Sequence, residues 1–193
     1  MFSFQVKTAP MLQDNLISFD QDRWLRALEE IAVGLGKEGD PVELCLIDSA
    51  VCLFGGMDGR ISRDLDVWLP ASDYDNADLR IAVEAAGLAF NPTGVLEPEM
   101  PYLQIVEPGI VQIGSFTPIK LMRMGRLHIT RPPIENIIAA KLTRCSEKDI
   151  ADIRYLISQY LPDFEKIKEI ATSFPQPARE QATENLVYLE IFK

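Results

Sequence analysis

Cysteine and histidine are scarce in this chain, and each shortage removes a class of protein. The three cysteines, Cys45, Cys52 and Cys145, are odd in number, far apart and set among apolar residues. This arrangement argues against a disulfide framework and against a zinc site, so all three are expected to be buried as small hydrophobic side chains. His128 is the only histidine, and no neighbouring residue marks it as a catalytic base.

Long apolar runs are also missing. No stretch is long enough to cross a bilayer, and residues 1–7 lack the charged and then apolar pattern of a signal peptide. The chain has 193 residues, of which 47% are hydrophobic and 25% are charged, a composition that suits one hydrophobic core. We therefore expect a cytoplasmic protein that does not associate with membranes.

Basic residues are outnumbered overall but not everywhere. Lysine and arginine total 19 against 29 aspartates and glutamates, and the net charge of -10 counts against nucleic-acid binding. Residues 120–154 nevertheless contain eight basic and four acidic residues, so this segment carries a charge of +4. Most of its basic side chains are expected to lie on solvent-exposed faces of helices. The segment could also bring cations to a bound phosphate.

Two aspartates one residue apart are the most informative feature that is present. Asp64 and Asp66 lie in an expected strand over residues 64–69, where alternate side chains share a face, so both point the same way. Carboxylates this close repel each other unless a cation lies between them, and hard divalent cations prefer carboxylate oxygens. Taken alone, the pair also fits a solvated strand face, so its context decides.

That context is an ordered series of elements. An apolar strand is expected over residues 42–47, a short helix over 49–54 and a glycine turn over 55–59, followed by Arg60, Ser62, Asp64 and Asp66 at alternate positions. The order resembles the nucleotidyltransferase superfamily related to DNA polymerase beta, most closely the small bacterial nucleotidyltransferases that include abortive-infection toxins. In that family an Arg-x-Thr-x-Asp-x-Asp segment supplies two metal-binding carboxylates, and here serine stands for threonine.

A second segment continues the resemblance. An expected helix over residues 134–144 carries Lys141, and Lys148 and Asp149 open the next helix. The segment is similar to the part of the family in which one helix carries a lysine and a nearby Lys-Asp pair begins another. The residues around Lys141 in this helix are mostly apolar. The lysine side chain must therefore either extend to solvent or point into a polar cleft. Ser146 and Asp149 match a capping box, which explains Asp149 without any chemistry.

The resemblance implies a fold and an activity. The fold is α/β (α+β), with a mixed-sheet nucleotidyltransferase-like core and flanking helices over residues 1–130 and a C-terminal helical subdomain over 131–193, packed on the core as one structural unit. The activity is transfer of a nucleoside monophosphate from a nucleoside triphosphate to an RNA, tRNA, protein or small-molecule acceptor. The family also implies a toxin role, with an antitoxin protein as its partner. Mg²⁺ (or Mn²⁺) would be held by Asp64 and Asp66, which with Lys141 form the catalytic set; the nucleotide-binding residues would be Ser49, Arg60, Ser62, Lys141 and Lys148.

The chain departs from the family pattern in two places. Asp48 stands where the family has its first glycine, and a carboxylate there would repel a triphosphate unless it faces away. Many members place a third carboxylate on a later strand, but the expected strands over 102–106 and 110–116 present Gln104 and Gln112, and Glu107 lies beside a Pro-Gly turn. A catalytically degenerate module that binds a nucleotide or a partner therefore remains a second interpretation.

Other enzymes with paired aspartates fit less well. Phosphohydrolases of the haloacid type place their aspartates after an apolar strand, whereas here a turn precedes the pair and the apolar residues follow it. The remaining pattern predicts an edge strand over 120–130. It also predicts helices over 23–36, 78–86, 134–144, 147–160, 163–172 and 177–191.

Overall fold

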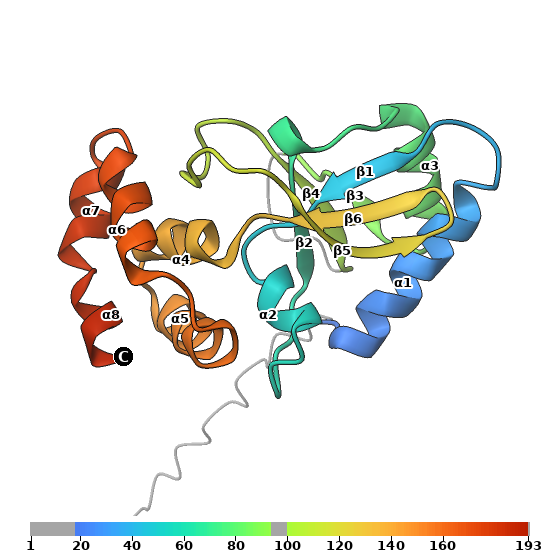
Figure 1. Ribbon diagram of the computed structural model, residues 1–193. Coiled ribbons are helices and arrows are strands. Elements are labelled where there is room, and N and C mark those ends of the chain that lie inside the picture. Colours follow the sequence, from blue (N-terminus) through green and yellow to red (C-terminus); the bar gives the residue numbers. More distant parts are fainter. Residues whose placement is uncertain (1–17, 94–99, 193) are drawn as a thin grey trace, which may run out of the picture.

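The structure is a computed structural model that describes residues 18–93 and 100–192 (Figure 1). Residues 1–7, where no signal peptide is expected, lie outside the described residues, as do residues 94–99 of the predicted loop region. Within the described part of the chain, no helix is both long enough and apolar enough to cross a membrane.

Two three-stranded sheets form the centre of the molecule. In the first, β1 (Val42–Cys45) runs parallel to β6 (Leu127–Arg131), which pairs antiparallel with β5 (Ile119–Met124). In the second, β4 (Tyr102–Val106) lies between β2 (Asp64–Trp68) and β3 (Ala89–Phe90), and both pairings are parallel. The sheets meet where Leu46, directly after β1, forms an antiparallel bridge with Val67 of β2. The prediction of a mixed sheet is therefore confirmed.

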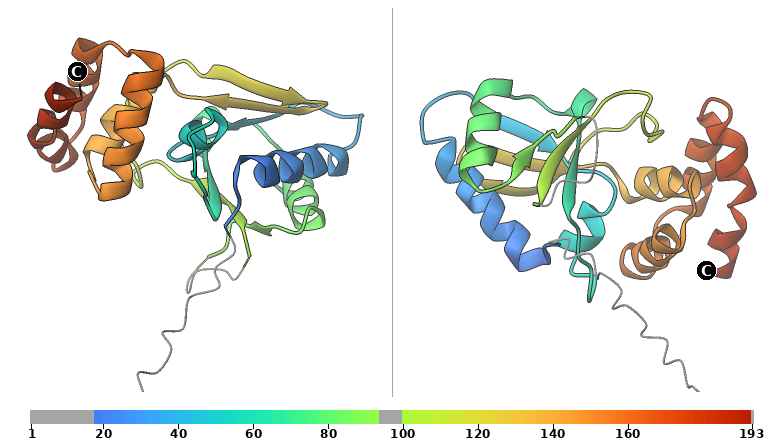
Figure 2. Two further views of the ribbon diagram at one scale, coloured as in Figure 1. Left: turned by 90° about the horizontal axis from the view of Figure 1, so that it is seen from below. Right: turned by 180° about the vertical axis from the view of Figure 1, so that it is seen from behind.

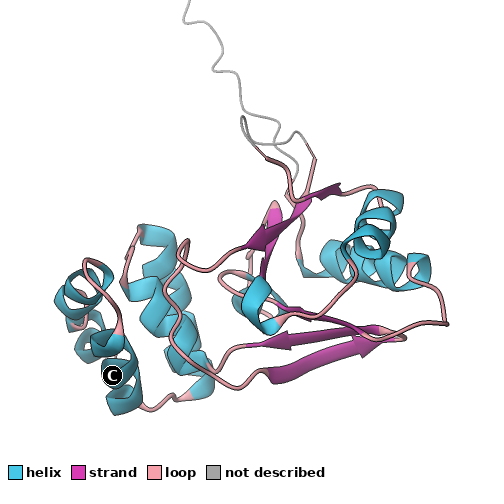
Figure 3. Ribbon diagram, turned by 90° about the horizontal axis from the view of Figure 1, so that it is seen from above, coloured by secondary structure: helices cyan, strands magenta, loops and turns pink. Residues whose placement is uncertain are grey.

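Helices flank the sheets at two ends. Helices α1 (Gln21–Gly34) and α3 (Asn76–Ala85) lie at one end, and the C-terminal helices gather at the other (Figures 1 and 2). The strands lie between these two helical groups when the molecule is seen from above (Figure 3). The short α2 (Ala50–Phe54) follows β1, and a 3-10 turn, η1 (Leu69–Ala71), follows β2. The C-terminal group consists of α4 (Ile134–Leu142), α5 (Glu147–Tyr160), α6 (Phe164–Ser173), α7 (Ala178–Glu184) and α8 (Val187–Ile191). The predicted α/β fold with flanking helices is thus confirmed.

Two large clusters of buried apolar side chains support this arrangement. One lies between α1, α3 and the strands, and the other lies among the C-terminal helices. Trp24 of α1 is fully buried in the first cluster, and its indole Nε1 donates a hydrogen bond to the carbonyl oxygen of Ser62 at 3.1 Å. The large apolar surface of the indole and this hydrogen bond together fix the backbone just before the aspartate strand.

The predicted strand over 110–116 is wrong. Gly109 and Gly114 both have positive φ angles, 94° and 72°, which an extended strand does not allow. The carbonyls of Ile113 and Ser115 accept hydrogen bonds from the side chain of Asn136 on α4, at 2.8 and 3.3 Å. A helix side chain therefore takes the place of a neighbouring strand, and the segment is an irregular loop.

Two other predicted elements are each divided. Residues 119–131 form a hairpin rather than one edge strand, because Gly125 makes a turn with a φ of 57°, so β6 is the central strand and β5 is the edge. The predicted helix over 177–191 is interrupted between α7 and α8. There the Asn185 side chain donates to the carbonyl oxygen of Leu142 at 2.9 Å, which anchors the break against α4.

Candidate functional site

Asp64 and Asp66 lie on one face of β2, as the alternation predicted. Asp64 accepts hydrogen bonds from the hydroxyls of Ser62, at 2.9 Å, and of Tyr102, at 3.3 Å. Tyr102 is the partner of Asp64 in the register between β2 and β4, so its ring lies on the same face. Both donors are neutral, and no lysine or arginine in the described ranges forms an ion pair with Asp64 or Asp66. The negative charge of the pair is therefore not balanced by direct contacts.

The neighbouring negative charge changes the acidity of Asp66. Burial, with the nearby carboxylates of Asp64 and Asp48, raises the pKa of Asp66 to about 7. An ordinary aspartate has a pKa near 3.9, so Asp66 holds its proton much more tightly than usual. A cation bound between the two carboxylates would favour the ionised form instead.

A hollow of about 270 Å³ brings most of the predicted site residues together. We call it the carboxylate hollow, and its walls include Asp48, Ser49, Arg60, Asp64, Asp66, Lys141, Arg144, Ser146, Lys148 and Asp149. Ser62 lies on a neighbouring hollow of about 390 Å³, the hydroxyl hollow, which Asp64, Arg60, Tyr102 and Lys148 also line. The exposed Lys148 borders both hollows and has no ion-pair partner in the described part of the chain. All predicted site residues thus surround the aspartate pair.

Ser49 is oriented toward the aspartate strand. It precedes α2, but its side chain caps no amide of this five-residue helix. It is buried, and its hydroxyl lies 3.2 Å from that of Ser62, which in turn donates to Asp64. A row of hydroxyls from Ser49 through Ser62 therefore supports one oxygen of Asp64.

Lys141 points into a polar interior rather than to solvent, one of the two outcomes that its sequence allowed. Its side chain is 2% exposed, and Nζ contacts Asp48, Asp152 at 2.8 Å and Asp149 at 3.3 Å. Burial on its own would lower the pKa of Lys141, but Asp48 and Asp152 outweigh this effect and raise it. An ammonium group has three N–H donors, and here each faces a carboxylate. Phosphate contact by Lys141 would therefore have to displace an aspartate.

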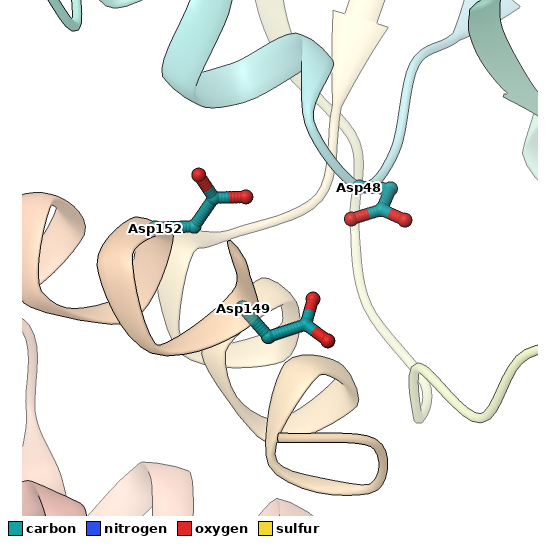
Figure 4. Close-up of side chains that lie close together, drawn as sticks. All are labelled: Asp48, Asp149 and Asp152. Atoms are coloured by element: carbon teal, nitrogen blue, oxygen red, sulfur yellow. The ribbon is translucent and has the colours of Figure 1, made fainter. Parts of the chain in front are cut away.

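The three aspartates around Lys141 come from distant parts of the chain. Figure 4 shows Asp48 on the turn before α2 and Asp149 and Asp152 on α5. One carboxylate oxygen from each lies within 4.8 Å of the others, a spacing that could hold a metal ion. The Lys141 ammonium contacts all three carboxylates, however, so the cation of this cluster is the lysine itself.

Two arginines complete the cluster. Arg144 Nη2 lies 2.8 Å from Asp48 Oδ2 and 2.8 Å from Asp149 Oδ1, and Arg60 Nη2 lies 2.8 Å from Asp152 Oδ2. Three cations thus face three carboxylates, and we call these six residues the ionic cluster. It joins α4 and α5 to the turns on either side of α2. Sequence reasoning named Arg144 only as one of the eight basic residues over 120–154 and gave Asp152 no role. The local signal for Asp152 was its place on the same helix face as Asp149, three residues earlier.

Asp48 belongs to this cluster and does not present a free charge to a phosphate. Its φ angle is 56°, in the left-handed region that favours glycine and that aspartate enters more readily than most residues. Burial would raise the pKa of Asp48, but Lys141 and Arg144 more than compensate and hold it at about 2.

Asp149 also has the capping role that its sequence indicated. Ser146 Oγ accepts from the amide of Asp149, and Asp149 Oδ2 accepts from the amide of Ser146, both at 3.2 Å. The capping box is therefore confirmed, and the same carboxylate additionally belongs to the ionic cluster.

Gln104 of β4 lies beside the aspartate pair. Gln104 is opposite Asp66 in the register between β2 and β4, and its Nε2 donates to Asn91 Oδ1 at 2.6 Å. Gln112 lies in the irregular loop over 110–116, and Glu107 is exposed after β4. The aspartate face of this sheet therefore has two carboxylates on β2 and a neutral side chain beside them.

The cysteines lie mostly where they were expected. Cys45 and Cys52 are buried and Cys145 is only partly buried, and none forms a disulfide. Burial raises the pKa of Cys45 to about 11 and that of Cys52 to about 12, so both remain protonated thiols at neutral pH.

The site therefore contains two kinds of carboxylate. Those of the ionic cluster are paired with lysine and arginine, whereas Asp64 accepts only from neutral hydroxyls and neither Asp64 nor Asp66 forms an ion pair within the described ranges. No family model, no curated protein and no solved structure matches the chain.

Proposed function

We propose that this protein is a metal-dependent nucleotidyltransferase of the cytoplasm, which moves a nucleoside monophosphate from a nucleoside triphosphate to an acceptor. One observation carries the proposal. The carboxylates of the ionic cluster each contact a lysine or arginine, whereas Asp64 and Asp66 lie together on one strand face and form no ion pair with any described residue. The order of the surrounding elements, which resembles the polymerase beta-related family, supports the same function.

The residues fit a hard divalent cation, either Mg²⁺ or Mn²⁺. Asp64 and Asp66 offer the oxygen ligands that such ions prefer, and the raised pKa of Asp66 reflects a place where positive charge is favoured. The absence of histidine and cysteine from the walls of the carboxylate hollow argues against zinc. When bound, the ion would neutralise charge on the phosphates and on the pyrophosphate that leaves.

The side chains of this protein would have three tasks. Ser62 and Tyr102 fix the oxygens of Asp64 by donating to them, so that this carboxylate is oriented before substrate arrives. Lys148, whose ammonium is exposed and unpaired among the described residues, would bind the triphosphate. The ionic cluster, which includes Lys141, holds α5 and hence Lys148 in position beside β2.

The hydroxyl hollow offers a place for the acceptor. It reaches Asp64 from the side of Tyr102 and lies next to the carboxylate hollow, with which it shares Arg60, Asp64 and Lys148. An acceptor hydroxyl there would approach a phosphate held at the carboxylate hollow. An RNA or tRNA end, a protein side chain and a small molecule are all compatible with this arrangement.

Label transfer tests the proposal. Each nucleoside triphosphate, labelled at the α-phosphate, would be incubated with the protein, Mg²⁺ and cellular RNA and protein. We expect label in one acceptor class with wild type, and none with Asp64→Ala/Asp66→Ala. Asp58→Ala, which changes an exposed aspartate on the preceding turn, is the matched control and should transfer normally. Equal transfer by the double variant and wild type would refute the proposal.

A degenerate binding module is the second candidate, and Gln104 is the observation that favours it. The amide beside Asp66 cannot act as an anionic metal ligand, and its hydrogen bond to Asn91 holds it away from such a role. This candidate predicts that wild type binds Mg²⁺-nucleotide but releases no pyrophosphate with any acceptor. If the protein is instead an active toxin, its expression should arrest growth, Asp64→Ala should relieve the arrest, and an antitoxin protein should bind it.

A further inference from the structure

An apolar hollow adjoins the carboxylate hollow on the far side of the ionic cluster. It has a volume of about 310 Å³, which falls at the lower end of the range for small-molecule sites. Its walls come from the segment after β1, the loop after β4, α4 and α7, and they include Ile47, Ile110, Val111, Ile137 and Ala178. Asp48, Lys141 and Arg144 line both hollows, so the two spaces meet along these charged side chains.

The apolar hollow has polar groups at its edge. Gln112 and Gln181 line it, and within the described residues neither side-chain amide has a hydrogen-bond partner. An amide group can both donate and accept, as the edge of a nucleobase requires. Ile110 lies on the wall and is 75% exposed, so its side chain is open to a ligand in the hollow. A flat ligand with weakly polar faces and hydrogen-bonding edges would cover it.

From this juxtaposition we propose that the apolar hollow binds the nucleobase of the substrate nucleoside triphosphate. The inference rests on the proposed function, because it places the triphosphate in the carboxylate hollow beside Lys148. A nucleotide has an anionic end and a flat, weakly polar end, and the two adjoining hollows offer matching surroundings in that order. Arg144, half exposed between them, would face the sugar and the first phosphate.

Comparing a nucleoside triphosphate with inorganic tripolyphosphate isolates the contribution of the base. Both would be titrated into the full chain with Mg²⁺, and the ratio of their dissociation constants measured for all four nucleotides. We expect at least one nucleotide to bind wild type about tenfold more tightly than tripolyphosphate. Ile110→Ser, which removes an exposed apolar side chain, and Ala178→Phe, which fills the hollow, should each bring this ratio below about threefold. Neither should change the affinity for tripolyphosphate.

A matched control and distinct failures make the test decisive. Val33→Ser removes a side chain that is 80% exposed on α1, outside all three hollows, and should leave the ratio unchanged. Equal binding of nucleotides and tripolyphosphate to wild type would overturn the nucleobase site while leaving the proposed function intact, as would an unchanged ratio in both hollow variants. Failure of wild type to bind either probe would overturn the nucleobase site together with the proposed function.

Discussion

Replacing Asp66 by asparagine should make the protein more stable, and increasingly so as the pH rises. Asp66 has a pKa of about 7 in the folded protein and an ordinary value near 4 when unfolded. The folded state therefore binds the proton more tightly, so the free energy of unfolding falls as the pH rises from about 4 to about 7 and then levels off. Asparagine cannot ionise, so the variant does not lose this part of its free energy of unfolding as the pH rises.

The size of the effect follows from the shift. Three pKa units correspond to about 4 kcal/mol at pH 8, since one unit is worth about 1.4 kcal/mol. Asp66 is only partly buried, and water and salt screen its interactions, so we expect Asp66→Asn to gain about 2 kcal/mol at pH 8. At pH 5.5, above the isoelectric point of about 4.6, the gain should be about half as large.

Urea denaturation of wild type and Asp66→Asn between pH 5.5 and 8.5 measures this gain. Asp58→Asn, an exposed substitution on the nearby turn, should stay within about 0.5 kcal/mol of wild type at every pH. Saturating Mg²⁺ should stabilise wild type but not Asp66→Asn, because the ion would bind the folded carboxylate pair. A variant that is less stable than wild type, or a gain that does not depend on pH, would refute the reasoning.

Further predictions concern the ionic cluster, the buried thiols and the aspartate strand. Lys141→Met should lower the free energy of unfolding by about 3 to 5 kcal/mol in urea denaturation, because it leaves Asp48, Asp149 and Asp152 short of a cation; a loss below 1 kcal/mol would contradict the network. Cys45 and Cys52 should resist a thiol reagent at pH 8 until urea unfolds the protein, as followed by mass spectrometry; rapid labelling of either in the native state would show that it is not buried as described. Tyr102→Phe should leave folding intact but weaken Mn²⁺ binding severalfold in a calorimetric titration, since Asp64 loses one donor; unchanged affinity would exclude a supporting role for the hydroxyl.

Local patterns were enough to predict most of the fold. Alternation placed Asp64 and Asp66 on one strand face, and helical spacing located the helices before residue 177 to within a few residues. The segment over 110–116 was predicted wrongly because its apolar residues follow the pattern of a strand. In the structure, its backbone carbonyls accept hydrogen bonds from the side chain of Asn136 on α4. A hydrogen bond from a distant side chain, in place of a neighbouring strand, cannot be recognised from the local sequence.

The site was predictable only in part, because some of its contacts join residues that are far apart in the sequence. The resemblance identified Asp64, Asp66, Lys141 and Lys148, and the structure brings them to one hollow. The pairing of Lys141 with Asp48 and Asp152 could not be read from spacing, because it joins the turn before α2 to two later helices. The charge of Asp48, which sequence reasoning took as an obstacle to phosphate, is compensated by residues that lie far from it in the chain.

The most direct test of the account asks which acidic cluster binds a divalent cation. Free Mn²⁺ would be followed by electron paramagnetic resonance during titration of wild type, Asp64→Asn/Asp66→Asn and Asp149→Asn, after each is shown to be folded. We predict that the double variant loses the bound Mn²⁺ and that Asp149→Asn retains it, because Lys141 already serves the cluster around Asp149. Loss of Mn²⁺ in Asp149→Asn with retention in the double variant would contradict the account.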